Sequence, residues 1–564
     1  MKKLFLIVVT MLSALTMSAQ PKHEVRAVWL TTNSGSDWPK GKYDEAKQKE
    51  LLVDILDRLA AANFNTIIFQ TQVKGDVAWV STMQPAMRYI TGDGAKGLSY
   101  DVSRFVIDEC HKRNMECHAW IVPYRIGTTS DANRYKNNSV KHPYTTHPEL
   151  CVTYNNALYL DPGLPETRQY LLDVYRELIT NYDYDGVNFD YTRYPGSDFD
   201  DADSYAAYNP EGLPKADWRR QNINTFIAEF YEMAKSINPD IKVGAAPIGT
   251  YKNVQGYGNM TAYGSVYQDA CQWMQSGNHD LLIPQMYWNE NYGFSPNMVT
   301  WVTNCAGRQL VIGLAPYKMV DGSNDWEVEV VTDQIEKIRN QNGTSGVCFF
   351  RADHVIDESE TKIADLYDAL QNNYFKYPAH IVPMEYNGIT YPNSPLNVKQ
   401  EYTDGQYHIT WDSPMLDELS TPIRYYSVYL CDGTTVDIND LQTVAAHIVK
   451  DNEFTYSSTD PNLRFAVTTF DKNYYESAPA ISETNSIDNI VTHFQICYAH
   501  DILTITGNKS VKQVDIYSIS GANLRHAQFN VPEVSINCSD FSKGMYIARI
   551  IYCDGTTTTH KFIR

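Results

Sequence analysis

The chain has 564 residues, of which 20% are charged and 12% aromatic, and its formal net charge is −20. One hydrophobic core rarely supports this length, so we expect one large domain and smaller ones. The acidic excess repels polyanions, so nucleic acid is not an expected partner. The aromatic content, with 41 Tyr and 10 Trp, is typical of a folded chain rather than a disordered one.

Residues 1–19 have the pattern of a secretory signal peptide. Two lysines precede an apolar run over residues 4–15, and a small-residue cleavage site ends at Ala19. Gln20 follows instead of the Cys that a lipid anchor requires. No later apolar run reaches the roughly 18 residues of a membrane-spanning helix. We therefore predict an exported protein, periplasmic, cell-surface or secreted, without a transmembrane segment.

The ten cysteines contain no Cys-x-x-Cys pair, which argues against a zinc knuckle or a disulfide-stapled miniprotein. Cys348 lies in an apolar run and is predicted to be a core residue; pairing among the others stays open. The histidines lack the spacing of a metal-dependent deacetylase. We expect neither a metal nor a cofactor.

Residues 20–376 alternate short apolar strands with longer amphipathic helices, which is the pattern of a parallel sheet with crossover helices. We therefore predict an α/β fold, a (β/α)8 TIM barrel. Residues 43–63 are one of the expected helices, with leucines on one face. Extra segments are expected after strands two, four and five. The eight predicted strands are 25–31, 66–70, 116–122, 186–190, 242–247, 281–287, 310–315 and 347–351.

From about residue 377 the alternation stops, and two small all-β sandwich domains are predicted. Segment 388–482 has strand-like runs at sandwich spacing and resembles a fibronectin type III module, with Trp411 as its core tryptophan. Segment 488–564 repeats short strands with turns and resembles the C-terminal sorting or anchoring domain of exported Bacteroidetes proteins. That resemblance implies an envelope or secreted destination and leaves open whether the tail is cleaved.

In a barrel of this kind, side chains at the carboxyl ends of the strands share one face, where active sites lie. Asp190 ends an apolar strand and is followed by Arg193, which is poor core design but suits an active site. Glycosidic cleavage needs two carboxyl groups, one on each side of the sugar. Asp190 is therefore the first candidate; the alternative is an Asp that caps a loop or pairs with Arg193.

Two other acids are candidates for the second carboxyl group. Glu290 lies beside Trp288 after strand six and suits a general acid whose pKa is raised by nearby rings. Asp76 follows strand two and precedes Trp79. For both, the alternative is a solvated loop residue.

Aromatic and polar side chains near the same strand ends are predicted to bind substrate. His118 and Trp120 lie two apart on one strand and so point to the same side; we expect His118 to bind a sugar hydroxyl rather than to catalyse. The other predicted substrate-binding residues are Tyr124, Arg125, Arg193, Tyr194, Gln285, Tyr287, Trp288 and Tyr317.

Together these segments resemble the glycosyl hydrolase family 10-like barrel proteins. The resemblance covers about residues 24–375 and rests on Arg26-Ala-Val-Trp-Leu, Lys74-Gly-Asp-Val-Ala, Glu116-Cys-His-Ala-Trp-Ile-Val-Pro-Tyr-Arg, Leu160-Asp-Pro-Gly, Asp185-Gly-Val-Asn-Phe-Asp-Tyr-Thr-Arg-Tyr-Pro, Ile283-Pro-Gln-Met-Tyr-Trp and Val311-Ile-Gly-Leu-Ala-Pro-Tyr. It implies an envelope enzyme that cleaves peptidoglycan glycan strands. Many members have Phe-Asp-Asp-Tyr at the fourth strand, whereas Tyr191 replaces the second acid here.

The leading hypothesis is a glycoside hydrolase acting on a polysaccharide or peptidoglycan glycan. The missing second acid leaves a non-catalytic surface glycan-binding protein as the alternative. Substrate linkage, retention or inversion of configuration and oligomeric state are not predicted by the sequence.

Overall fold

The computed structural model describes residues 20–564, apart from 259, 306, 323, 385–390, 416–420, 485–493 and 554. The predicted signal peptide lies outside the described residues. The chain divides into two compact units, Met1–Val382 and Pro383–Arg564. Among the residues that the structure describes, no helix has the length and apolar character needed to span a bilayer.

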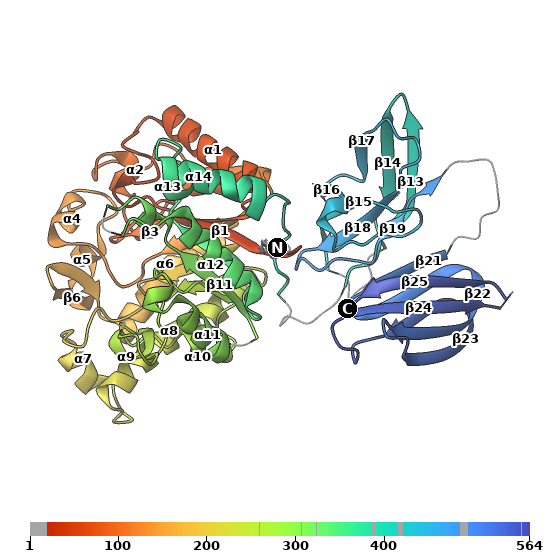
Figure 1. The fold of residues 1–564 in the computed structure, drawn as a ribbon. Helices are drawn as coiled ribbons and strands as arrows, with labels where there is room; N and C mark the ends of the chain where they lie inside the picture. The colour runs from red at the N-terminus through yellow and green to blue at the C-terminus, as the bar shows by residue number, and fades with distance from the viewer. Residues whose placement is uncertain are drawn as a thin grey trace, which may run out of the picture. The chain divides into compact units, whose positions relative to one another are not determined.

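The first unit contains a closed parallel barrel with the strand order β1-β12-β11-β10-β9-β8-β5-β2, seen in Figure 1. The predicted TIM barrel is therefore confirmed, and seven of its strands end within two residues of the predicted bounds. The barrel strands are β1 (Val25–Leu30), β2 (Thr66–Gln70), β5 (Glu116–Ile121), β8 (Gly186–Asp190), β9 (Lys242–Ala246), β10 (Leu281–Leu282), β11 (Gln309–Leu314) and β12 (Gly346–Phe350).

Two local features differ from the prediction. Strand β10 has only two residues instead of seven, since Pro284 has no backbone N–H to donate to the ladder; one isolated bridge on each side of Gln285 continues the pairing. A long insertion also follows β5, where none was expected. It contains α4 (Thr129–Arg134), α5 (Pro143–Thr146) and the hairpin of β6 (Cys151–Tyr154) with β7 (Ala157–Leu160).

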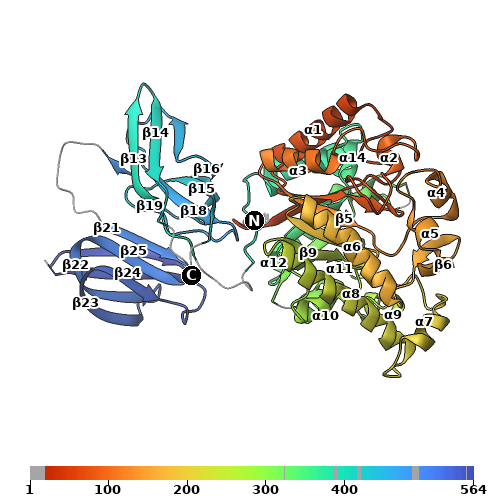
Figure 2. The same cartoon turned by 180° about the vertical axis from the view of Figure 1, so that it is seen from behind.

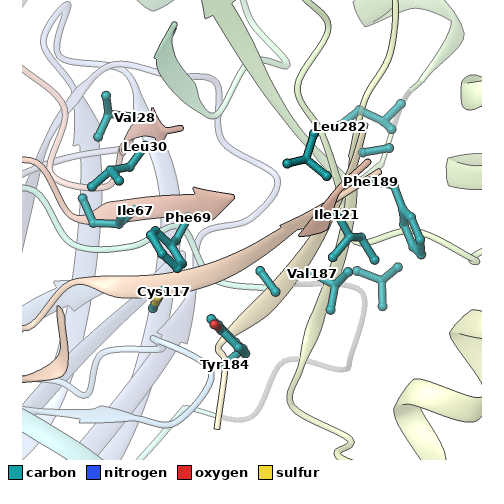
Figure 3. Close-up of a cluster of buried hydrophobic side chains, with 14 of the residues drawn as sticks. Val28, Leu30, Ile67, Phe69, Cys117, Ile121, Tyr184, Val187, Phe189 and Leu282 are labelled. Atoms are coloured by element: carbon teal, nitrogen blue, oxygen red, sulfur yellow. The ribbon is translucent and has the colours of Figure 1, made fainter. Parts of the chain in front are cut away.

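Helices surround the barrel in Figures 1 and 2. The outward side chains of the strands pack against them; Figure 3 shows part of this layer, with Phe69, Ile121 and Phe189 among its buried residues. The longer helices are α1 (Glu45–Ala61), α3 (Val102–Lys112), α6 (Pro165–Asn181), α8 (Lys215–Ile237), α11 (Phe294–Asn304), α12 (Val328–Asn340) and α14 (Thr361–Ala369).

The shorter helical segments lie in the connections. They are η1 (Asn33–Gly35), α2 (Arg88–Thr91), η2 (Pro148–Leu150), α7 (Ala202–Ala207), α9 (Ala262–Ser265), α10 (Ala270–Gln275), η3 (Glu290–Tyr292), η4 (Pro316–Met319), α13 (Asp353–Ile356) and η5 (Leu370–Tyr374). A small hairpin of β3 (Gln72–Val73) and β4 (Asp76–Val77) directly follows β2.

The inward side chains fill the barrel in layers. Near the amino ends of the strands, Lys242 donates to both oxygens of Glu116 at 2.9 and 3.0 Å, and His118 lies 3.0 Å from the same carboxylate. Above them an apolar layer includes Trp29, Ile68 and Cys348. Cys348 is fully buried, as predicted.

A disulfide joins Cys271 of α10 to Cys305, the residue after α11. It closes a segment in which the two cysteines are 34 positions apart. Sequence spacing alone left this pairing open.

The second unit contains the predicted β-domains. Two four-stranded sheets, β17-β14-β13-β20 and β16-β15-β18-β19, share one core that includes Tyr407, Trp411, Tyr426 and Phe465. Trp411 is buried, as predicted. The strands are β13 (Leu396–Thr403), β14 (Gln406–Asp412), β15 (Ile423–Leu430), β16 (Val444–Val449), β17 (Glu453–Ser457), β18 (Phe465–Asp471), β19 (Ala480–Ile481) and β20 (Glu483–Thr484), with η7 (Leu441–Thr443) between β15 and β16.

The C-terminal strands form one antiparallel sheet with the path β21-β22-β24-β25, and β23 pairs with β22. Bulges interrupt the long β22–β23 ladder, and the sheet has its own apolar core. The strands are β21 (Phe494–Ala499), β22 (Ile502–Ser518), β23 (Asn523–Asn537), β24 (Met545–Tyr552) and β25 (Thr557–Ile563).

Candidate active site

Asp190 is the last residue of β8 and lies on the inward face of the barrel. Gly186 and Asp190 are an even number of residues apart, and Gly186 abuts the inward-facing His118. Asp190 is 5% exposed. Its carboxyl group is therefore at the inner edge of the barrel mouth, as predicted.

The Asp190 carboxyl group is surrounded by donors. Its Oδ1 accepts hydrogen bonds from Gln285 Nε2 at 3.0 Å and from the Tyr191 backbone N–H at 2.8 Å. Burial raises the pKa of Asp190, while the positive charge of Arg193, these hydrogen bonds and the Trp120 indole oppose that rise. No salt bridge to Asp190 occurs among the described residues, so the alternative of a private ion pair with Arg193 is not what the structure contains.

Aromatic rings line the mouth beside Asp190. Phe350, the last residue of β12, packs against Trp120, Tyr287 and Tyr317, with ring centroids 5.7 to 6.4 Å apart. The negative charge of Asp190 is among the causes that raise the pKa of Tyr287 well above its usual value, the largest being burial. The structure thus brings together Asp190, Trp120, Gln285, Tyr287 and Tyr317 from the ends of four strands, β5, β8, β10 and β11.

Two arginines lie at the edge of this group. The Arg193 guanidinium stacks 4.3 Å from the ring of Tyr191, which is 44% exposed and has a left-handed backbone (φ 51°). Arg125 is half-buried. The negative charge of Asp190 raises the pKa of Tyr191, and the positive charges of Arg193 and Arg125 oppose that rise. The residue that replaces the usual second acid is therefore a surface ring with positive charges beside it.

Asp76 lies on β4, in the hairpin that follows β2. It is 2% exposed and accepts a hydrogen bond from the Tyr135 hydroxyl. Burial raises its pKa to about 7, although that hydrogen bond and the charges of Lys74 and Arg88 oppose the rise. Asp76 is therefore only partly ionised at neutral pH.

Glu290 does not have the environment that we predicted. Its carboxylate is 42% exposed and forms a 3.0 Å salt bridge with Lys337 of α12 and a 2.6 Å hydrogen bond with Ser295 of α11. Although partial burial raises its pKa, these partners lower it by more. The prediction that nearby rings raise the pKa of Glu290 is wrong, and its side chain is engaged with the outer helices.

Three predicted substrate-binding residues are buried elsewhere. His118 is 1% exposed and bonded to Glu116, one inward layer below Trp120. Tyr124 is 2% exposed and packs on Phe226 of α8. Tyr194 is fully buried and accepts a hydrogen bond from Asn222. The contacts that these three side chains make lie outside the ring cluster around Phe350, because proximity to a strand end in the sequence does not fix the depth or the direction of a side chain, and their role in substrate binding stays a prediction.

Trp288 is half-buried, and its backbone carbonyl accepts a hydrogen bond from Gln334 of α12 at 2.7 Å. Its ring lies against Gly249, where an added Cβ would come within 2.5 Å of Cζ3. Trp288 therefore fixes the loop after β9 rather than joining the ring cluster around Phe350.

The end of β12 contributes a further group of charged side chains. Arg351 binds Asp37 and lies 3.1 Å from Asp353. Burial, partly opposed by Arg351, raises the pKa of Asp37 to about 6. Burial and the same arginine lower the pKa of His354 to about 4, so this ring is neutral at neutral pH. The strand-end rule already pointed to this segment, but Phe350 reads as an ordinary core residue.

The donors at the mouth do not form a metal site. In the described part of the chain, no group of three or more His, Cys, Asp or Glu side chains could hold a metal ion. What the arrangement offers instead is a buried carboxyl group, hydrogen-bond donors and ring faces, which suit the binding and hydrolysis of a sugar chain.

Comparison with known proteins agrees with this class. A model of the family described as glycosyl hydrolase-like 10 matches residues 24–326, and the chain belongs to this family. A model of the secretion system C-terminal sorting domain matches residues 499–564. The protein is thus a glycoside hydrolase, and its sorting domain indicates export to the cell surface or into the medium.

Two relatives and one solved structure give the extent of the similarity. Glycosyl hydrolase YngK of Bacillus subtilis (strain 168) is 29% identical over 487 residues, which are 82% of this chain and 93% of that protein. Glycosyl hydrolase DigH of Escherichia coli (strain K12) is 31% identical over 373 residues, 60% of this chain and 84% of that protein. The PgaB (BpsB) glycoside hydrolase domain from Bordetella bronchiseptica is 13% identical with a TM-score of 0.44, over 62% of this chain and 99% of that domain.

Proposed function

We propose that this protein cleaves glycosidic bonds in a bacterial glycan outside the cytoplasm, with peptidoglycan glycan strands as the first substrate to test. The substrate class follows from the resemblance of the strand-end segments to envelope hydrolases. The second unit then holds the barrel at its destination: residues 388–482 as a fibronectin type III-like spacer and residues 488–564 as the sorting domain.

The observation that carries this proposal is the environment of Asp190. A carboxyl group that is buried in the mouth and hydrogen-bonded by Gln285 and a backbone N–H is held in one orientation. Burial raises the pKa of this carboxyl group, and the donors and Arg193 offset part of that rise because they stabilise the anionic form. We assign Asp190 the role of nucleophile or general base.

Asp76 is our candidate for the general acid. Its pKa of about 7 keeps a proton on the carboxyl group near neutral pH, which is what proton donation to a leaving oxygen requires. The hydrogen bond from Tyr135 holds this side chain in place. Burial raises the pKa of both carboxyl groups, so the assignment of the two roles rests on their different partners, Tyr135 for Asp76 and Gln285 with Arg193 for Asp190.

The strand order bears on the stereochemistry. Strands β2 and β8 are separated by β5 alone, so their ends lie about 10 Å apart at the usual spacing of neighbouring strands. Inverting glycosidases have carboxyl groups about 6.5 to 9.5 Å apart, and retaining ones about 5 Å. Because Asp76 lies on β4, beyond the end of β2, the spacing of the strand ends does not set the distance between the two carboxyl groups, and NMR of the first-formed anomer decides between inversion and retention.

The test of the function is product release from purified, peptide-free peptidoglycan strands, followed by mass spectrometry. We expect soluble fragments from the wild type and a loss of at least about a hundredfold in rate for Asp190→Asn. Asp203→Asn, which changes an exposed Asp of α7, is the matched control. Retention of the glycan without any cleavage by the wild type contradicts the proposal and supports a glycan-binding role.

A further inference from the structure

Two cations converge on one phenol at the rim of the barrel mouth. Lys74 Nζ and Arg88 Nη2 donate to the hydroxyl oxygen of Tyr89 at 2.8 and 2.7 Å. Both also face its ring, with Lys74 Nζ 5.0 Å and the Arg88 guanidinium carbon 4.3 Å from the centroid. One hydroxyl group therefore holds two positive charges together, and although burial raises the pKa of Tyr89, Lys74, Arg88 and Ser34 lower it by more.

The negative charge close to this pair is limited. Asp131 is 3.5 Å from Arg88, but its other oxygen is engaged by Thr128 at the start of α4. Asp76 also interacts with both cations, and its pKa of about 7 leaves it only partly charged at neutral pH. The cluster therefore has a positive excess in a chain whose formal net charge is −20.

The cluster is open to solvent and belongs to the catalytic face. Lys74, Arg88 and Tyr89 are half-buried, and the Tyr89 hydroxyl also bonds to Ser34, which is exposed. Lys74 and Gly75 form the turn of the hairpin after β2, and both have left-handed backbones (φ 60° and 75°), as in a tight hairpin turn. Strand β2 ends two strands from Asp190, about 10 Å away along the rim.

We propose that Lys74 and Arg88 form a subsite that binds a carboxylate carried by the glycan, one or two sugar units from the bond that is cleaved. A carboxylate can accept from both cations beside the Tyr89 hydroxyl, in charge-assisted hydrogen bonds. The overall negative charge of the chain repels an acidic glycan. A local cluster of positive charge at the mouth turns that repulsion into attraction for a carboxylate that comes close to it. This inference rests on the proposed function for its substrate and specifies that the substrate is acidic.

The carboxylate could be the lactyl group of muramic acid or that of a uronic acid. Binding is measured by calorimetry with Asp190→Asn protein, so that no ligand is cleaved. The ligands are peptide-free peptidoglycan strands, the same strands with their carboxyl groups reduced to alcohols, and oligogalacturonate. Binding of the strands alone assigns the lactyl group, and binding of oligogalacturonate as well assigns any sugar carboxylate.

We expect the carboxylate form of the strands to bind about tenfold more tightly than the reduced form, as one charged hydrogen bond implies. High salt should reduce this difference in affinity, because it screens the charges. Lys74→Met should abolish this difference, whereas Lys74→Arg and the exposed control Lys136→Met should preserve it. Equal affinity for both forms in the Asp190→Asn protein, or an equal loss for both forms in Lys74→Met, overturns the proposal. Because this readout needs no cleavage, it is independent of whether the wild type hydrolyses the strands.

Discussion

Replacing Asp76 with Asn should make the barrel more stable at alkaline pH. The folded protein raises the pKa of Asp76 from 3.8 to about 7, and each tenfold change in an acid constant corresponds to about 1.4 kcal/mol. The ionised carboxyl group therefore destabilises the folded state by about 4 kcal/mol once it is fully charged. Asn cannot ionise, and its carbonyl oxygen can still accept the Tyr135 hydrogen bond.

The pH dependence follows from the sign of this change. Below about pH 4 the carboxyl group is protonated in both the folded and the unfolded chain, so Asp76 has no effect there. Between pH 4 and 7 the unfolded chain releases the proton and the folded chain keeps it, so wild-type stability falls. Above pH 7 the difference is complete, and Asp76→Asn should then exceed the wild type by about 4 kcal/mol.

Urea unfolding followed by tryptophan fluorescence measures this effect, because nine of the 10 Trp residues precede residue 382. The exposed Asp203→Asn substitution should leave the curve unchanged at every pH. Equal stabilities of Asp76→Asn and the wild type at pH 8 would refute the claim that the ionised, buried carboxyl group lowers the free energy of unfolding.

The same variant tests catalysis. A rate loss of about a hundredfold or more is expected because the general acid is missing, despite the added stability.

Three further outcomes are expected. Replacing Cys271 and Cys305 with Ser should lower the free energy of unfolding by about 4 kcal/mol, the loop-closure value for cysteines 34 positions apart; adding a reductant to the wild type should remove the difference. Gly346→Ala should cost more than about 3 kcal/mol or prevent folding, because its Cβ would lie 2.0 Å from the Val25 carbonyl oxygen; a normal melting temperature contradicts this. Glu290→Gln should change the hydrolysis rate less than about threefold, since an exposed ion pair contributes little, and a hundredfold loss would restore it as a catalytic candidate.

The barrel was predictable because each strand is a short apolar run buried on both faces, and such runs alternate visibly with amphipathic helices. The length of β10 was overestimated, because the apolar content of the segment does not show that Pro284 lacks a backbone N–H to donate to the neighbouring strand. The insertion after β5 was missed because its elements have at most six residues each, so that they lack a long periodic pattern.

The placement of a side chain at the mouth was predictable where it lies at the last position of a barrel strand or in the few residues that follow β10. Asp190, Gln285 and Tyr287 meet at the mouth because strand ends converge in a closed barrel. Tyr124 and Tyr194 lie beyond their strands, where the chain has turned toward the helices, and no local pattern records that turn. Burial and the hydrogen bond from Tyr135, 59 residues away, set the pKa of Asp76, and Lys337 of α12 acts on Glu290, so neither pKa could be predicted from neighbouring residues.

The charged layer at the base of the barrel constrains how a polymer can reach the mouth. Because Glu116, His118 and Lys242 close that end, the interior is a packed plug rather than a passage. A long chain therefore cannot thread through the barrel, and it has to reach and leave the site by the one open face, so the products of cleavage depart on the same side on which the substrate arrives.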